Sequence, residues 1–192
     1  MSIDLQTLQA FCSNDPTRPN LHAPFYIGEF TYATDGVIAI RIPGKLTRNP
    51  KPRAMRAGPE PLFKRHLFFH PDFLHMLGDF TIPAPASIPC VECQMLEKPD
   101  PGCDECSGSG AILEYPAARL SRDGRAFDCR YLAAIAALPE AELCDAPPPN
   151  PVDLVNAAAF RFSGGYGLLM PLTKIRSRDP ILLPQRTTTH AR

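Results

Sequence analysis

Four of the seven cysteines fall into two pairs with the spacing of a metal site. The first pair is Cys90 and Cys93, and the second pair, nine residues later, is Cys103 and Cys106. Two residues between the members of a pair let both sulfurs of a tight turn face one ion, and a second pair completes a tetrahedron of thiolates. The sequence therefore predicts one zinc ion held by four cysteines.

Four thiolates limit what such an ion does. They leave no coordination position for water, so we expect the zinc to organise backbone rather than to catalyse. Two disulfides are an alternative that requires an oxidising compartment. A redox-active CxxC pair is a further alternative, but it is expected near a βαβ pattern rather than between proline and glycine. The chain begins Met-Ser-Ile-Asp without a secretory signal pattern, which favours zinc and a cytoplasmic protein.

The length of the chain is enough for one hydrophobic core. Its 192 residues suffice for one domain plus an insertion, and 20 basic against 20 acidic residues give a formal charge of zero. The overall charge therefore gives no argument for nucleic acid or membrane. No apolar run approaches the roughly 20 residues of a membrane span, so we expect no membrane contact. The 23 prolines cluster at 43–61, 83–101 and 147–151, which predicts loops there.

Apolar spacing predicts a helix followed by antiparallel strands, twice. Residues 2–12 have helical spacing with Ser2 as a candidate cap, and residues 21–43 indicate a β-meander with a tight turn at Asp35-Gly36. Residues 129–138 predict a second helix, and 152–173 predict strands joined by a hairpin at 163–167.

The segments between these helix-and-strand stretches give weaker patterns. Residues 118–128 alternate around a predicted turn at 122–124. Within residues 62–77, which Pro71 interrupts, we expect a strand or turn before the proline and a short helix after it.

These elements predict an α+β protein with two helix-plus-antiparallel-strand halves and an inserted zinc knuckle. We expect the first half at 1–87, including a basic, proline-rich loop at 43–61, and the zinc-binding insert at 88–114. The second half is expected at 115–173, and a flexible basic tail at 174–192.

Two stretches resemble one known family. Residues 30–40, Phe-Thr-Tyr-Ala-Thr-Asp-Gly-Val-Ile-Ala-Ile, resemble the Ala-Thr-Asp-Gly hairpin of bacterial DNA polymerase sliding-clamp domains. Residues 166–172, Tyr-Gly-Leu-Leu-Met-Pro-Leu, resemble the closing Met-Pro strand of those domains. The resemblance implies a single clamp-like domain, built as a twofold helix-plus-strands repeat, with partners in DNA replication. The whole chain also looks like small prophage-type bacterial proteins that combine such a half with a cysteine-rich insert.

The second cysteine pair resembles another family. Residues 103–110, Cys-Asp-Glu-Cys-Ser-Gly-Ser-Gly, are similar to the Cys-x-x-Cys-x-Gly-x-Gly knuckles of DnaJ-type co-chaperones, matched by Cys103, Cys106, Gly108 and Gly110. This resemblance implies a zinc-knuckle adaptor or chaperone-like module that binds proteins. The glycines also have a structural explanation, since backbone at a metal-bound turn often needs a positive φ.

Charge is distributed unevenly along the chain. Residues 41–66 carry eight basic residues against Glu60, and the candidate phosphate contacts among them are Arg48, Lys51, Arg53 and Arg56. A solvated loop is the alternative, because residues 43–62 offer no aromatic platform for stacking bases. The zinc segment is acidic, which would repel phosphate and favours a protein partner.

No catalytic signature stands out in the chain. We find no HExxH arrangement, phosphate-binding Gly-Lys-Ser/Thr loop, dinucleotide fingerprint or nucleophile elbow. The sequence therefore predicts a non-enzymatic zinc-binding accessory protein with protein partners, and nucleic-acid contact through the basic loop as a second candidate interaction.

Overall fold

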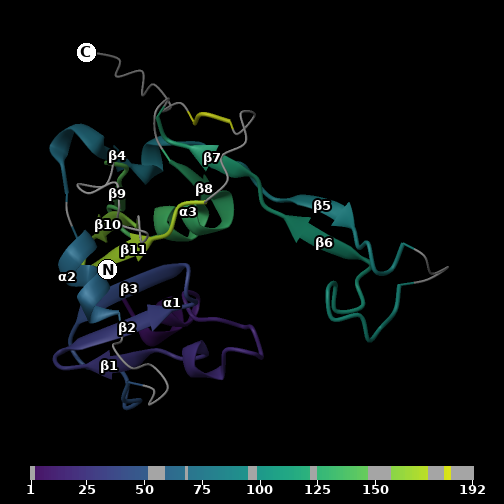
Figure 1. The fold of residues 1–192 in the computed structure, drawn as a ribbon, viewed down its shortest axis with the longest axis horizontal. Coiled ribbons are helices and arrows are strands. Elements are labelled where there is room, and N and C mark those ends of the chain that lie inside the picture. The colour runs from purple at the N-terminus through teal and green to yellow at the C-terminus, as the bar shows by residue number, and fades with distance from the viewer. Residues whose placement is uncertain are drawn as a thin grey trace, which may run out of the picture.

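The computed structural model describes residues 3–51, 59–67, 69–94, 99–121, 125–146, 157–172 and 180–182. They form an α+β fold in which strands predominate (Figure 1). The helices are α1 (Leu5–Gln9), α2 (Glu60–His66) and α3 (Cys129–Ala136), with short 3-10 turns η1 (Pro19–Leu21), η2 (Pro71–Phe73) and η3 (Leu77–Asp79). The strands are β1 (Phe25–Ile27), β2 (Phe30–Thr34), β3 (Ile38–Pro43), β4 (Leu74–Met76), β5 (Ala86–Pro89), β6 (Ala111–Glu114), β7 (Ala117–Arg119), β8 (Ala126–Asp128), β9 (Glu142–Cys144), β10 (Ala158–Phe162) and β11 (Gly165–Leu169).

One antiparallel sheet of seven strands forms the body of the protein, in the order β1-β2-β3-β11-β10-β9-β4. The predicted meander at 21–43 supplies β1 to β3, and the predicted hairpin at 163–167 joins β10 to β11. The two groups meet where β3 and β11 pair antiparallel, with Ile40 opposite Gly167. Each group follows a helix, α1 or α3, so the predicted order of helix and meander occurs twice.

Both predicted helices are present, but the first is shorter than the predicted 2–12 and has a different cap. Helix α1 begins after Asp4, whose carboxylate accepts the Thr7 N–H at 2.8 Å. Asp4 therefore caps the helix in place of the predicted Ser2, which lies outside the described residues, because a carboxylate one residue before the first turn satisfies its open amides. Helix α3 begins after Asp128, which accepts the Arg130 N–H in the same way at 2.8 Å.

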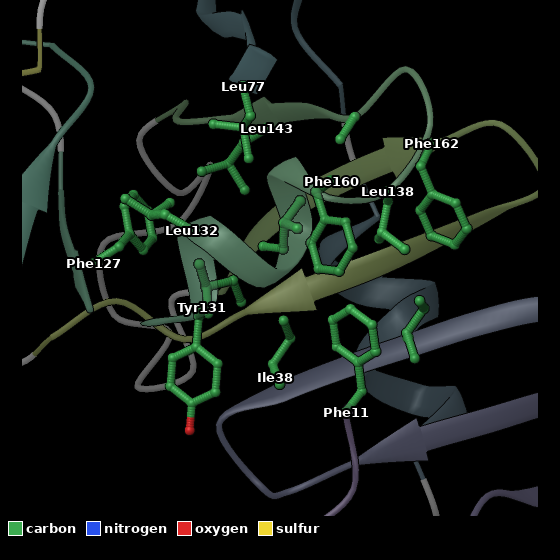
Figure 2. Packing of buried hydrophobic residues seen from close by; sticks show 14 of the residues in the cluster. Phe11, Ile38, Leu77, Phe127, Tyr131, Leu132, Leu138, Leu143, Phe160 and Phe162 are labelled. Atoms are coloured by element: carbon green, nitrogen blue, oxygen red, sulfur yellow. The ribbon is translucent and has the colours of Figure 1, made fainter. Parts of the chain in front are cut away.

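The main core lies between these two helices and one face of the sheet (Figure 2). Leu8 and Phe11 from the first helical region pack with Leu132 and Ile135 of α3, and all four are buried. The predicted amphipathic spacing of residues 2–12 is thus correct for Leu8 and Phe11, whereas Leu5 is 43% exposed. The two halves share one continuous core.

In the second half, a phenylalanine ring packs over a glycine of the neighbouring strand. Phe160 pairs with Gly167 across β10 and β11, and a Cβ on Gly167 would lie 1.9 Å from the Phe160 ring. The equivalent pair of the first hairpin is Ala33 opposite Ile40, where the small residue lies on the other strand. Each pair combines one large and one small side chain, so the large one occupies the space that the small one leaves.

Helix α2 covers the opposite face of the sheet. Phe63 is buried there and its ring meets that of Tyr32 edge to face, with the centroids 5.7 Å apart. The Arg41 guanidinium lies 4.9 Å from the Phe63 ring centroid and pairs with Glu60 at 3.7 Å. Helix α2 therefore covers part of this second face, around Phe63 and Tyr32, while Tyr166 and Arg161 stay exposed.

The prediction for residues 62–77 was wrong in its order. A helix, α2, precedes Pro71, and the strand β4 follows it. Pro61 lies in the first turn of α2, where a missing N–H costs nothing, and Pro71 opens η2 in the same manner. Residues 74–76 are extended because they pair with β9 at the edge of the sheet, with Leu74 opposite Cys144.

Residues 86–128, between the first group of strands and α3, form two separate hairpins. Strands β7 and β8 pair as the alternation at 118–128 predicted, while their turn at 122–124 lies outside the described residues. Strands β5 and β6 pair alone and project away from β7 and β8, carrying the cysteines at their far end (Figure 1). We call residues 86–114 the zinc arm.

Part of the predicted tail contacts the domain. In the segment 174–192 the structure describes residues 180–182, where the Arg119 N–H donates to the Pro180 carbonyl at 3.0 Å and the Leu182 N–H donates to the Arg119 carbonyl at 2.8 Å. Leu182 is buried in the main core. These three residues thus lie beside β7. No helix among the described residues has the length and apolar character needed to cross a membrane.

Candidate metal centre

The four predicted cysteines meet at the end of the zinc arm. Their sulfur atoms all lie within 4.8 Å of one another, and they form the metal-compatible cluster found in the described part of the chain. The nearest pairs join the two turns, with 3.7 Å between the sulfurs of Cys90 and Cys103 and 3.6 Å between those of Cys93 and Cys106. Three of the four residues are buried and Cys103 is half-buried.

These distances fit a metal ion and not a disulfide. Zinc–sulfur bonds of about 2.3 Å in a tetrahedron place the sulfurs about 3.8 Å apart. A disulfide holds its sulfurs at about 2.05 Å, and all the cysteines are free thiols. Soft thiolate ligands in a four-coordinate arrangement suit zinc, so the residues fit the ion that the spacing predicts.

Two glycines shape the second turn, as the sequence predicted. Gly108 and Gly110 have φ values of 80° and 72°, which residues with a side chain rarely adopt. A Cβ on Gly110 would lie 2.7 Å from the Pro99 ring, so the turn also requires the missing side chain. The Gly110 N–H donates to the Cys106 sulfur at 3.2 Å, which orients that ligand and stabilises its thiolate.

The thiols influence one another's ionisation. Burial raises the pKa of Cys106, but the Gly110 N–H and the neighbouring thiols outweigh it and the pKa falls to about 7. A backbone hydrogen bond lowers the pKa of Cys93, yet burial and the other three thiols raise it overall to about 12. The neighbouring thiols therefore favour ionisation at Cys106 and disfavour it at Cys93. A divalent cation removes this conflict because it replaces the protons.

Apart from the cysteines, the arm buries little. Its buried cluster consists of Cys90, Cys93 and Cys106, with Cys103 and Ile112 packed against it. Val91 and Leu113 are 66% and 61% exposed. Few apolar contacts hold the turns, so a metal ion is the strongest constraint that the residues of the arm offer.

The basic loop is described in part. Arg48 is exposed and Lys51 half-buried, while Arg53 and Arg56 lie outside the described residues. Of the other basic residues, Arg41 lies under α2 and Lys45 pairs with Glu29 at 3.2 Å. Phosphate contact by Arg48, Lys51, Arg53 and Arg56 stays a prediction.

One buried polar cluster, around Asp145, had no signal in the sequence. The Asp145 side chain is fully buried and its Oδ1 lies 3.3 Å from the Arg125 Nε. It also accepts the Arg125 N–H at 3.2 Å and the Ser121 hydroxyl at 3.3 Å. Burial raises the pKa of Asp145 although Arg125 opposes the rise. These contacts join β8 to the end of β9, and they explain why a carboxylate is tolerated there.

The chain was compared with known protein families, curated proteins and solved structures. No protein-family model, no curated protein and no solved structure matches the chain. Its function is therefore inferred from the geometry of its own residues.

Proposed function

We propose that this protein is a non-enzymatic, zinc-binding accessory protein that acts by binding other proteins. The observation that carries the proposal is the convergence of four thiols from two turns within 4.8 Å. Zinc held by four thiolates has no open position for a substrate or water. Cys90, Cys93, Cys103 and Cys106 are the ligands, and the ion holds an arm that its few apolar side chains do not stabilise alone.

The body of the protein is a clamp-like domain linked to phage or bacterial DNA replication. Support comes from the order of the elements, since a helix and a three-stranded meander occur twice and the meanders join through antiparallel β3 and β11. An approximate twofold repeat requires this arrangement. The link to replication rests on the resemblance of residues 30–40 and 166–172 to sliding-clamp motifs.

An apolar cavity of about 220 Å³ supports binding to a protein partner. It lies where the two clamp-like motifs meet, between Gly36 and Val37 of the β2–β3 turn and Leu168 and Met170 at the end of β11. Leu62 of α2 forms part of its wall and is 37% exposed. A cavity of this size and lining admits one or two apolar side chains of a partner.

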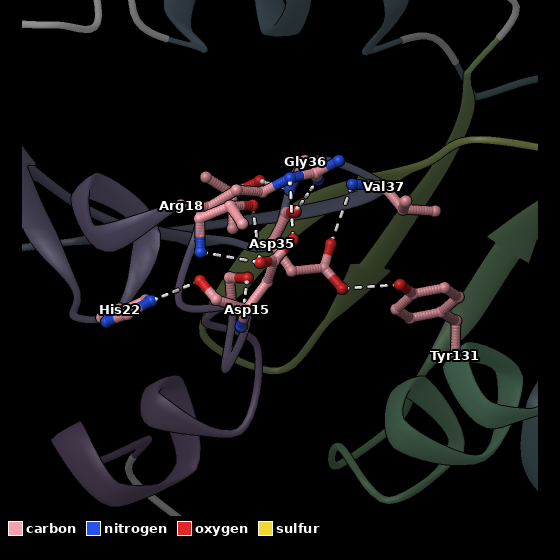
Figure 3. Close-up of polar contacts among 10 residues, drawn as sticks. Asp15, Arg18, His22, Asp35, Gly36, Val37 and Tyr131 are labelled. Carbon is pink, nitrogen blue, oxygen red and sulfur yellow. Dashed lines mark hydrogen bonds and ion pairs between the residues drawn. The ribbon is translucent and has the colours of Figure 1, made fainter. Parts of the chain in front are cut away.

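The turn beside this cavity is held rigidly (Figure 3). The Asp35 carboxylate accepts the Val37 N–H at 2.8 Å and, with its other oxygen, the Tyr131 hydroxyl at 2.6 Å. The Arg18 guanidinium donates to the Asp35 carbonyl at 3.0 Å. Contacts from both halves fix the turn, so a partner would bind a preformed surface at little entropic cost.

Capture of partner proteins by the wild type and two leucine variants tests the replication link. Leu62→Lys places a charge in the cavity wall, and Leu46→Lys changes a leucine of similar exposure, 41%, that does not line the cavity. We expect bacterial replication proteins, identified by mass spectrometry, to be captured by the wild type and by Leu46→Lys but not by Leu62→Lys. Capture unchanged in Leu62→Lys would contradict the proposal.

The alternative function is a zinc-knuckle adaptor or chaperone-like module. The exposed acidic residues of the arm favour it over direct phosphate binding. In the same experiment Cys106→Ser removes a zinc ligand and leaves the cavity unchanged. Loss of unfolded client proteins in Cys106→Ser, with replication proteins absent from all captures, supports this alternative.

Nucleic-acid contact through the basic loop has a separate test. Neutralising Arg48, Lys51, Arg53 and Arg56 should abolish retention of the protein on immobilised DNA at low salt, because phosphate contacts depend on these charges. Retention that is unchanged would remove this interaction.

A further inference from the structure

The two edges of the zinc arm differ in their ability to accept another strand. In the described part of the chain, β5 and β6 pair only with each other. Strand β5 ends at Pro89 and follows Pro83 and Pro85, and prolines block the edge of a sheet because they lack a donor. Strand β6 contains no proline. Among the residues that the structure describes, nothing pairs with its outer edge, which is therefore open to a further strand.

The register identifies which backbone groups face outward. The Cys90 N–H donates to the Gly110 carbonyl at 2.9 Å, so this pair is hydrogen-bonded. Bonded and non-bonded pairs alternate along antiparallel strands, which makes Ser87 and Leu113 a non-bonded pair. The N–H and carbonyl of Leu113 thus point away from β5.

Ala111, two residues earlier, supports this assignment. Its carbonyl accepts the Ser109 hydroxyl at 2.7 Å, so its outward group is bonded within the turn. Leu113 lies beyond the reach of that turn, and its side chain is 61% exposed. At Leu113 the outer edge thus offers backbone groups for hydrogen bonding and an exposed apolar side chain for packing. An edge that receives an extended segment needs both.

The negative charge of the arm indicates which kind of segment could pair with the outer edge of β6. The arm has six acidic residues and one lysine, a net charge of −5, and its described acids, Glu92, Asp100, Asp104, Glu105 and Glu114, are all exposed. Four thiolates around a divalent ion add two further negative charges. Pairing of two arms through β6 would bring equal negative charges together, which disfavours a second arm as the occupant.

We infer that the outer edge of β6 binds an extended basic segment of a partner protein, which adds a strand at Leu113 and places its positive side chains against the acids of the arm. This inference rests on the zinc site of the proposed function, because the ion fixes the end of the hairpin. It identifies the partner by chemistry: an extended backbone that alternates basic and apolar side chains.

Binding of a synthetic peptide to the zinc-loaded full-length protein tests the inference. The probe is a twelve-residue peptide that alternates lysine with valine. One control replaces every lysine with glutamate, and a second keeps the lysines but carries N-methyl groups on alternate backbone amides, which prevents strand pairing. We expect binding of the first peptide only, weakening as salt rises.

Two proline variants provide the matched test on the protein. Leu113→Pro removes the outward N–H of β6, and Ser87→Pro makes the same change opposite it on β5, where neither removes a bond between the two strands. We expect Leu113→Pro to weaken binding about fivefold or more, as the loss of one hydrogen bond implies. Ser87→Pro should leave binding unchanged. Zinc content, measured on both variants, should stay at that of the wild type.

Each contrary result overturns the inference. Equal binding of the N-methylated peptide would mean attraction by charge without strand pairing, and absence of binding at low salt would mean that the edge has no such role. Self-association in sedimentation experiments that Leu113→Pro abolishes would assign the edge to a second copy. If the protein holds zinc and fails to bind, the zinc site survives and only this inference falls. If it holds no zinc, both fall.

Discussion

The sheet domain and the zinc arm are held together by different means. One face of the sheet is buried under α1 and α3, and α2 covers part of the other. The arm is a two-stranded hairpin whose buried residues are cysteines, with Ile112 beside them. A lone two-stranded hairpin is marginally stable in water. Four thiols, with the ion that we propose they hold, therefore take the place of a core where too few apolar residues are present.

This division predicts that the two regions respond independently to perturbation. Structural zinc contributes about 10–16 kcal/mol to the folding of small zinc peptides, which exceeds what a few partly exposed apolar side chains supply. The domain, in contrast, has no metal-compatible cluster among its described residues. The following changes test this independence.

The largest effect is expected from removing one metal ligand. Cys106→Ser should abolish stable zinc binding and release the arm, because three thiolates no longer close the site. Hydrogen exchange of the arm amides should approach the unfolded rate while amides of β3 and β11 stay protected. A protein whose sheet also loses protection would show that the two regions are not independent. Cys12→Ser, at a cysteine outside the cluster, is the control.

The converse change removes a ring from the main core. Phe160→Ala should destabilise the domain by about 3–5 kcal/mol, the usual cost of emptying a buried aromatic site. Denaturant unfolding measures this loss, and zinc content of the folded protein should not change. Phe73→Ala, at a phenylalanine that is 36% exposed, should cost far less. Equal losses in both variants would contradict the assigned core.

A pair of glycine substitutions should affect one region each, the arm or the sheet. Gly110→Ala adds a Cβ close to Pro99 at a positive φ, and Gly167→Ala adds one against the Phe160 ring. Each should cost about 1–3 kcal/mol, through backbone strain in the first and overpacking in the second. The first should weaken zinc binding in competition with a chelator and leave the melting of the sheet unchanged. The second should do the opposite, and the same response from both would contradict the account.

Acid should act on the two regions with opposite sign. Protons compete with zinc for the thiolates, so zinc binding weakens as the pH falls. The raised pKa of buried Asp145 means that its contribution to stability is present below its unfolded value of 3.8 and is lost as the pH rises through its folded pKa. The wild-type domain should therefore gain stability relative to Asp145→Asn on acidification. Unfolding of both proteins across this pH range measures the difference, and parallel curves would contradict it.

Local patterns were sufficient for the cluster of four cysteines and for the hairpins. The spacing of four cysteines brings their sulfurs together through two short turns, and each turn depends on residues next to it in the chain, such as Gly108 and Gly110. The same holds for the β2–β3 turn, where Gly36 adopts a φ of 96°. These features are predictable because sequence neighbours determine them.

Features that depend on distant residues were not predictable in the same way. Residues 74–76 are a strand because β9 lies beside them, and nothing in Leu-His-Met specifies that neighbour. Asp145 is buried through its contacts with Arg125 and Ser121, which come from another hairpin. The pairing of β3 with β11 joins residues more than a hundred positions apart, and only the folded chain reveals it.

Metal analysis of the reduced protein, purified without chelator, tests whether the four thiols hold an ion. We expect about one zinc ion per chain, with the thiols of Cys90, Cys93, Cys103 and Cys106 protected from alkylation until a chelator is added. Essentially no bound metal, together with rapid alkylation of all four thiols in the folded protein, would contradict the account.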